Sequence, residues 1–236
     1  MKARIFDALR AALAERRAVA LVTDLGSGLQ TLVDAEGRQQ GDAGLEDEFL
    51  PQVVEAIRQD RRGIVEFYDG RFFINVHPPA NRLLIVGAVH LAQALVPAAR
   101  LAGFDVSVID PRTAFATPER FPETDLITEW PDEALERLRP DARTAVVALT
   151  HDPKFDDPTL TAALSSDAFY VGVLGGRKNQ AARLERLRAQ GVPAEQLARI
   201  HGPVGLDIGA VSPAEIAVAI LADIILALRG PKWKAG

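Results

Sequence analysis

The chain has no cysteine among its 236 residues. Disulfide bonds, thiolate metal ligands, cysteine nucleophiles and the carriage of sulfur as a persulfide are therefore excluded for this chain. A basic stripe is also missing, because the 27 lysines and arginines are mixed with 32 acidic residues and the net charge is -5. We therefore expect no nucleic-acid partner. A chain without disulfides fits a reducing compartment, and we expect a cytoplasmic location.

Long apolar runs are scarce. The most apolar stretch, 216–228, is shorter than the roughly 20 residues that a membrane-spanning helix needs, and Asp223 interrupts it. We interpret this stretch as a buried helix and expect no membrane partner. At the start of the chain, apolar side chains recur at helical spacing, which predicts an amphipathic first helix with one face formed by Ile5, Phe6, Leu9 and Leu13.

The pattern of predicted strands and helices changes near residue 80. Residues 1–78 predict a small α+β domain, with strands at Val19–Thr23, Thr31–Val33, Gly63–Phe67 and Phe72–Val76 and a helix at Phe49–Gln59. Asp69-Gly70 predicts a hairpin turn between the last two strands. Consecutive prolines in His77–Ala80 resist both helix and central strand, and so predict a linker.

Residues 82–230 alternate between apolar strands and helices, which predicts a Rossmann-like, doubly wound parallel sheet covered on both faces. The predicted strands are 83–86, 106–109, 126–128, 145–149 and 169–173. Helices are predicted at 90–102, 158–164, 178–189, 194–200 and 216–228, and a further helix that includes Leu138 is predicted after the third strand. Asp157-Pro158 and Ser212-Pro213 each place a capping side chain before a proline. Ser212 and Glu215 also have capping-box spacing.

Ligands of such a sheet collect at the carboxyl ends of the strands, so the loops there are candidates for a site. The first loop, Gly87 to His90, follows a strand and opens a helix, as dinucleotide-binding turns do. Val89 stands where close approach of a pyrophosphate requires glycine, which argues against NAD or FAD. His90 either touches a ligand phosphate or lies on the surface. Asp110, at the end of the second strand, either binds a ribose hydroxyl or makes a turn.

Three further loops are rich in polar residues and glycine. The loop after the fourth strand carries His151, Asp152 and Lys154, for which we favour proton transfer, anion binding or oxygen-ligand coordination over a solvated loop. The next loop, with Gly175, Gly176, Arg177 and Lys178 at a helix start, predicts a phosphate cradle. The last, His201–Ala210, has a special backbone path set by Gly202, Pro203, Gly205 and Gly209, with His201 and Asp207 as polar members.

These loops, taken in order, resemble those of the XdhC/CoxI family, the accessory factors of xanthine dehydrogenase and related molybdenum hydroxylases. The resemblance covers about residues 83–228 and rests on Thr150–Lys154, Leu174–Arg177, His201–Ala210, Phe115–Pro122 and Ser212–Ala217. It implies a Rossmann-type domain that binds molybdenum cofactor, protects it and inserts it into a partner apoenzyme, while a cysteine desulfurase sulfurates the cofactor. It thus implies a chaperone rather than a turnover enzyme, with no catalytic residues and no metal ligands of its own.

On this resemblance the terminal phosphate of the cofactor is expected on Gly175, Gly176 and Arg177, with His151, Asp152, His201 and Asp207 around the metal end or the pterin ring. The full set of expected cofactor-binding residues is Gly87, His90, Asp110, His151, Asp152, Lys154, Gly175, Gly176, Arg177, His201, Gly202, Gly205 and Asp207. Two alternatives stay open: an NAD(P)-dependent oxidoreductase that uses Asp110 for ribose, and an interaction protein that has lost ligand binding. A homodimer is expected because dimers are common among soluble proteins.

The chain also departs from the family pattern. Val89 replaces the second glycine of the family's Gly-Ala-Gly-His turn. Of the two motifs of the family's first domain, only Gly26-Ser27 and Gly44-Leu45-Glu46 survive, and the motif cysteine is missing. We therefore expect residues 1–78 to be a degenerate form of that domain.

Overall fold

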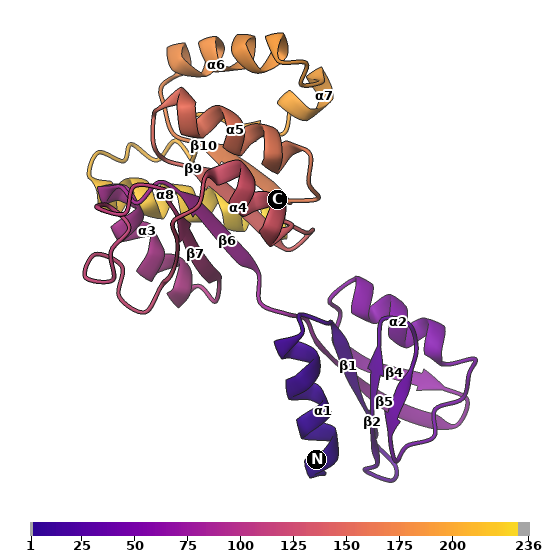
Figure 1. The fold of residues 1–236 in the computed structure, drawn as a ribbon. Helices are drawn as coiled ribbons and strands as arrows, with labels where there is room; N and C mark the ends of the chain where they lie inside the picture. Colours follow the sequence, from indigo (N-terminus) through magenta and orange to yellow (C-terminus); the bar gives the residue numbers. More distant parts are fainter. Residues whose placement is uncertain (1, 231–236) are drawn as a thin grey trace. The chain divides into compact units, whose positions relative to one another are not determined.

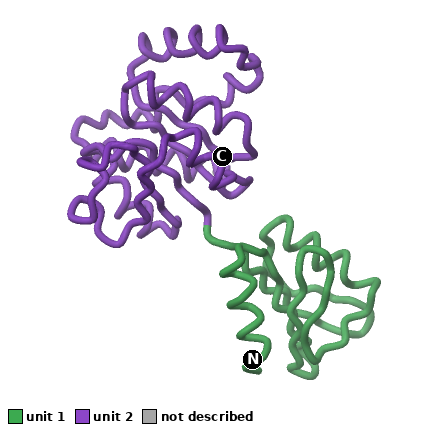
Figure 2. Tube along the Cα trace, viewed as in Figure 1, with its two compact units in different colours: residues 1–80 green, residues 81–236 purple. Residues whose placement is uncertain are grey.

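The computed structural model describes residues 2–230 and divides into two compact units, Met1–Ala80 and Asn81–Gly236 (Figure 2). Each unit has its own sheet and its own hydrophobic core. No helix within the described residues is long and apolar enough to cross a membrane.

Unit 1 is an antiparallel sheet of five strands with one helix on each face. The strands are β1 (Val19–Asp24), β2 (Gln30–Asp34), β3 (Gln39–Gly41), β4 (Gly63–Phe67) and β5 (Gly70–His77), in the order β3-β2-β1-β5-β4. Alternate side chains of β1 face opposite ways: Val19 and Leu21 pack under α1 (Ala3–Ala14), and Ala20 and Val22 pack under α2 (Leu50–Arg58). Both faces of this strand are therefore buried.

The sequence predicts most of unit 1, with three corrections. Ile5 and Leu9 of α1 are buried as expected, but Phe6 is 46% exposed. The buried face of the helix consists of Ile5, Leu9 and Ala12, and Phe6 lies outside it. The hairpin turn between β4 and β5 consists of Tyr68 and Asp69, so that Gly70 begins β5. Strand β3 was not predicted, since its three residues are all exposed and carry no apolar pattern.

Unit 2 is a parallel sheet of six strands in the order β11-β10-β9-β6-β7-β8. The neighbouring strands β10, β9, β6 and β7 can be followed in Figure 1. The strands are β6 (Arg82–Val86), β7 (Asp105–Ile109), β8 (Asp125–Ile127), β9 (Thr144–Ala148), β10 (Tyr170–Val173) and β11 (Ile200–His201). The chain runs outward from β6 in one direction and then from β9 in the other, which is the Rossmann order with its switch point between β6 and β9.

Helices cover both faces of this sheet. Apolar residues of α3 (His90–Leu101) and α8 (Pro213–Arg229) form one core with it. Those of α4 (Pro131–Leu138), α5 (Pro153–Leu164), α6 (Arg177–Ala189) and α7 (Ala194–Leu197) form the other. The central strand β9 is buried along its whole length, as a strand covered on two sides must be. The predicted doubly wound α/β fold is confirmed.

Two helix boundaries in unit 2 differ from the prediction. Helix α5 begins at Pro153 and not at Pro158, because Asp152 caps it by accepting a hydrogen bond from the Lys154 amide at 3.0 Å. Asp157, the cap that the sequence suggested, lies inside the helix and pairs with Arg186 at 2.7 Å. The helix predicted at 194–200 ends at Leu197, and its last predicted residue begins strand β11. The capping box of Ser212 and Glu215 is confirmed.

Candidate ligand site at the carboxyl end of the sheet

The first turn of unit 2 runs from Gly87 to the start of α3. Gly87 has a φ of 111°, and a Cβ there would lie 2.8 Å from the Thr150 methyl carbon, so the turn requires glycine. Val89 is the residue before the helix and has extended backbone. His90 is exposed, with Nδ1 3.3 Å from the Gln93 side-chain oxygen. The Ala88 amide, which a dinucleotide-binding turn would offer to its ligand, instead donates to Asp110 at 2.8 Å.

The carboxylate of Asp110 is engaged in hydrogen bonds with other groups of the protein. Its side chain is 1% exposed, and it accepts hydrogen bonds from the Arg112 amide at 3.0 Å and from the Arg112 guanidinium at 2.8 and 2.9 Å. Burial alone would raise the pKa of Asp110, but the hydrogen bonds from Arg112 and Ala88 outweigh it and hold the pKa below its usual value. This arrangement does not fit the predicted contact between Asp110 and a ribose. Arg112, two residues further along, is the partner that sequence reasoning missed.

Arg112 also belongs to a cluster of cations and aromatic rings. Its guanidinium lies 4.6 Å from the centre of the Phe115 ring and 5.0 Å from that of Phe155. Trp130 stacks on Phe155 at 5.4 Å, and the Lys154 ammonium lies 4.9 Å from the Trp130 ring. Lys154 is thus held on an aromatic surface by a cation–π contact.

The loop after β9 holds two other candidate residues, His151 and Asp152, and their surroundings differ from those of Lys154. His151 is exposed and has a φ of 61°, a left-handed backbone that few residues other than glycine adopt. Asp152 is also exposed, but one of its oxygens is engaged as the α5 cap. Both residues therefore lie at the surface where β9 ends, and the cap gives Asp152 a structural role besides any contact with a ligand.

A buried charged pair ties the loops after β9 and β10 together. Arg183 of α6 donates to Asp156 of α5 at 3.3 Å, to the Leu174 carbonyl at 3.0 Å and to Gln180 at 2.8 Å. Asp156 also accepts from the Thr150 hydroxyl at 2.6 Å. Burial raises the pKa of Asp156, and the contacts with Thr150 and Arg183 only partly oppose this. The network joins α6 and the loop before it to α5 and the loop after β9.

The same network holds the loop after β11. Gly202 lies against the Gln180 side chain so closely that a Cβ would come within 2.4 Å of it. The close contact therefore favours glycine at this position, because a larger residue would displace the Gln180 side chain that Arg183 holds. Gln180 thus contacts both Arg183 and Gly202, which joins the loops that follow β10 and β11.

A second polar cluster supports this last loop from the face covered by α8. The Tyr170 hydroxyl donates to Asp223 of α8 at 2.6 Å, and His201 Nδ1 lies 3.2 Å from the same Asp223 oxygen. Burial and the neighbouring Asp223 raise the pKa of Tyr170, so its hydroxyl stays protonated and donates. Neither Tyr170 nor Asp223 was predicted as a site residue, because each lies in an apolar stretch.

These supports place the α6 start and the last loop around one pocket of about 380 Å³. Its lining comprises Arg177, residues 203–210, Ile216 and Ala219. Of the predicted site residues, the pocket brings together Arg177, Gly205 and Asp207. Gly176 immediately precedes α6, whose first amides point outward without acceptors of their own helix. The other predicted residues do not line it; these are Gly87, His90, Asp110, His151, Asp152, Lys154, Gly175, Gly176, His201 and Gly202.

The pocket offers groups for an anion and an organic ring but none of the usual sets for a metal. Arg177 and the helix start supply positive charge, and Asp207 supplies a carboxylate. Between residues 2 and 230, no group of three or more histidine, cysteine, aspartate and glutamate side chains could hold a metal ion.

The fold and the pocket define a Rossmann-type domain whose candidate ligand site lies beside the sheet edge formed by β10 and β11. Residues 83–224 match the model of the XdhC Rossmann domain, and the chain belongs to the XdhC family. The predicted family membership is thereby confirmed.

Curated relatives are similar over about two thirds of this chain. The chain is 36% identical over 157 residues to the uncharacterized protein YqeB of Escherichia coli, covering 65% of this chain and 28% of YqeB. It is 37% identical over 157 residues to a Bacillus subtilis protein named as a probable xanthine dehydrogenase subunit, covering 65% of this chain and 44% of that protein. It is 30% identical over 146 residues to the E. coli molybdenum cofactor insertion chaperone PaoD, with coverage of 62% and 40%. The matches thus span less than half of each of these relatives.

A solved structure is similar across both units. The crystal structure of a protein described as a xanthine dehydrogenase of Bacillus halodurans has a TM-score of 0.74 and 25% identity, covering 96% of this chain and 65% of that one.

Proposed function

We propose that this chain is an accessory protein that binds molybdenum cofactor as cargo and delivers it to a xanthine dehydrogenase-type molybdenum hydroxylase. The family membership and the names of two relatives, an insertion chaperone and a xanthine dehydrogenase subunit, support this role. The chain has no cysteine, so sulfuration of the cargo would fall to a separate cysteine desulfurase. The likeness to the B. halodurans protein supports the further proposal that unit 1 is a degenerate form of the family's first domain.

The observation that carries the proposal is the meeting of Arg177 and residues 203–210 in one pocket. A volume of about 380 Å³ falls within the range of small-molecule sites. The terminal phosphate of the cofactor would accept hydrogen bonds from Arg177 and from the first amides of α6, because a helix N-terminus attracts anions. Asp207 would accept from the amino and ring N–H groups of the pterin.

The remaining predicted residues take supporting or outer roles in this proposal. Gly175 and Gly176 give α6 its exposed start, and His201 and Gly202 hold the loop that Gly205 and Asp207 belong to. Exposed groups at the neighbouring strand ends would contact only a ligand that extends beyond the pocket; these are His90, His151 and Lys154.

The test is a binding titration of the full chain with freshly released molybdenum cofactor under anaerobic conditions. Arg177→Ala should weaken binding about tenfold or more, since a charge-assisted hydrogen bond contributes about 1.5–3 kcal/mol. Lys178→Ala is the matched control, because Lys178 is exposed on the same turn but does not line the pocket. A dephosphorylated pterin should bind wild type and Arg177→Ala equally. Unchanged affinity of Arg177→Ala for the intact cofactor would defeat the proposal.

A further inference from the structure

Strand β4 of unit 1 is the last strand of its sheet, so one of its edges is unpaired within that unit. Edge strands of this kind commonly carry a proline, a bulge or an inward charge that prevents another strand from pairing with them. β4 reads Gly-Ile-Val-Glu-Phe, with no proline, and its only charge, Glu66, lies on an exposed position. The edge is therefore chemically open to an added strand.

The hairpin register identifies the free backbone groups. Phe67 and Gly70 flank the Tyr68–Asp69 turn, and residues that flank a two-residue turn form a hydrogen-bonded pair. Bonded and non-bonded pairs alternate along an antiparallel ladder. The N–H and C=O groups of Ile64 and Glu66 therefore point away from β5, toward the free edge.

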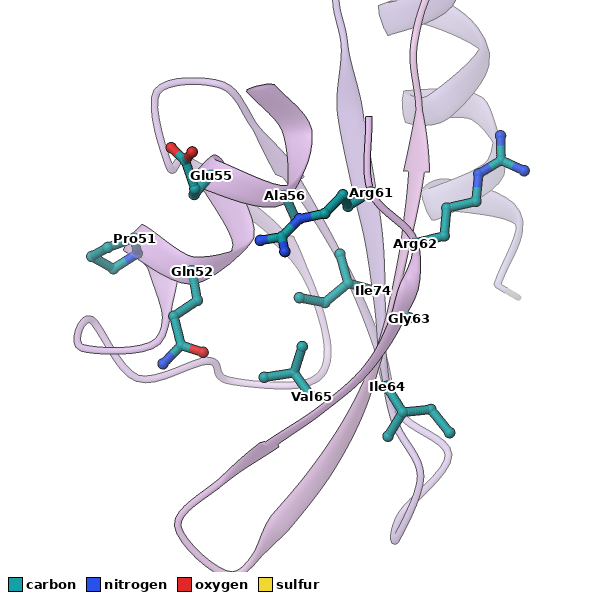
Figure 3. Close-up of a pocket in the computed structure, with 10 residues that line it drawn as sticks. All are labelled: Pro51, Gln52, Glu55, Ala56, Arg61, Arg62, Gly63, Ile64, Val65 and Ile74. Atoms are coloured by element: carbon teal, nitrogen blue, oxygen red, sulfur yellow. The ribbon is translucent and has the colours of Figure 1, made fainter. Parts of the chain in front are cut away.

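A pocket of about 480 Å³ lies between this strand and α2 (Figure 3). Val65 and Ile74 project into it from the sheet, and its helical wall includes Pro51, Gln52 and Ala56. The Ile64 side chain points away from the pocket and is 54% exposed on the opposite face of the strand. A strand added along β4 would thus place alternate side chains in the apolar pocket and against Ile64.

Within the described part of the chain, the pocket has a cation without an ion-pair partner, and its acidic residue is already engaged. The Arg61 guanidinium extends toward the pocket at the point where β4 begins (Figure 3), and between residues 2 and 230 it has no ion-pair partner. Glu55, the acidic residue of the lining, is engaged by Arg58 and Gln59 of its own helix segment. An unopposed cation therefore stands at one end of an apolar groove.

We propose that this groove binds an extended peptide that pairs antiparallel to β4 and presents a carboxylate to Arg61. The carboxyl-terminal end of an antiparallel strand lies opposite the start of β4, which is where Arg61 stands. An apolar side chain of the peptide fills the space over Val65 and Ile74. The ligand is thus the tail of a partner protein that ends in an apolar residue and a carboxylate, recognised by β-strand addition.

The inference is independent of the cofactor site, since every residue in it belongs to unit 1. The test uses the full chain against a random octapeptide library with free carboxyl termini, followed by fluorescence polarisation of the selected peptides. Ile64→Pro removes an edge donor but none of the ladder bonds to β5, and should abolish selection. Arg61→Glu should weaken selected peptides about tenfold or more. Arg10→Glu makes the same charge change at an exposed arginine of α1 that does not line the pocket, and should leave binding unchanged.

Amidation of the selected peptides should reproduce the loss seen with Arg61→Glu. Equal binding by wild type and Ile64→Pro would overturn the proposal, as would selection without any preference for a free carboxylate. Concentration-dependent dimers that Ile64→Pro abolishes would also overturn it, because the edge would then pair with a second copy of the chain.

Discussion

The Asp110 carboxylate accepts hydrogen bonds from both Arg112 and the Ala88 amide of the first turn. Replacing Asp110 with asparagine removes its negative charge but keeps an oxygen acceptor for the Ala88 amide. We expect a loss of about 1–2 kcal/mol in the free energy of unfolding, which is below the usual value for a buried ion pair because Arg112 can be rehydrated. The Arg112 side chain is 34% exposed in this pair, against 1% for Asp110. Asp110→Ala also leaves the buried Ala88 amide without a partner, and should cost about 3–4 kcal/mol.

Urea unfolding followed by Trp130 fluorescence measures this cost. Trp130 stacks on Phe155, which Arg112 contacts, so its signal reports unit 2, and Trp233→Phe in all variants removes the only other tryptophan. Asp105→Asn, at the exposed opposite end of β7, is the control and should change stability by less than about 0.5 kcal/mol. An Asp110→Asn variant as stable as this control would refute the assignment of Asp110 as a tether.

The same variant tests the depressed pKa of Asp110. A carboxyl whose pKa is lower in the folded than in the unfolded chain stabilises the fold above the unfolded pKa, and this stabilisation is lost as pH falls through the folded pKa. The stability difference between wild type and Asp110→Asn should therefore be constant near neutral pH and shrink once the pH drops below the ordinary value of 3.8. A difference that grew on acidification would contradict the lowered pKa.

Two further predictions concern the supports of the last loop. Tyr170→Phe removes the hydroxyl that donates to Asp223, which also contacts His201 at the start of the last loop, and should cost about 1–2 kcal/mol and speed hydrogen exchange of the amides around His201, measured by mass spectrometry. Gly202→Ala drives a Cβ into the Gln180 side chain that Arg183 holds, and should cost about 1–3 kcal/mol in urea unfolding, a loss that Gln180→Ala in the same chain should largely cancel.

Each of these has a matched contrast. Tyr68→Phe removes the hydroxyl of a tyrosine that is 75% exposed, and should leave stability and exchange unchanged. If Tyr170→Phe behaved like Tyr68→Phe, the hydroxyl would not support the loop. Strictly additive effects of Gly202→Ala and Gln180→Ala would show that the two residues do not interact.

The fold followed from the sequence because its strongest patterns are local. Apolar strands alternating with amphipathic helices predict a parallel sheet, and Ser212 with Glu215 predicted the start of α8 correctly. Asp152-Pro153 and Asp157-Pro158 carry the same local capping pattern, however, and tertiary contacts decide between them. Asp157 finds Arg186 on another helix, and nothing in the local sequence indicates that pairing.

The site was less predictable for the same reason. Sequence could place Arg177 after the strand at 169–173, because that position depends only on where the strand stops. It placed Asp207 in a loop but missed the short strand β11 before that loop, which was predicted as the end of a helix. It could not show that Asp110 is satisfied by Arg112, or that Tyr170 and Asp223 meet behind the last loop, since those contacts depend on side-chain direction across the fold.

The placement of the pocket beside β10 and β11, and not over the switch point between β6 and β9, bears on how a cargo would leave. A molecule in a central crevice is enclosed by loops from both halves of the sheet, and its escape requires them to separate. One held at the rim lies against a single loop, the start of α6 and the first turns of α8, so an incoming protein surface can reach it directly. Local opening of a few loop residues costs far less than parting two halves of a sheet, which would suit the proposed role of a carrier that retains its cargo and then releases it.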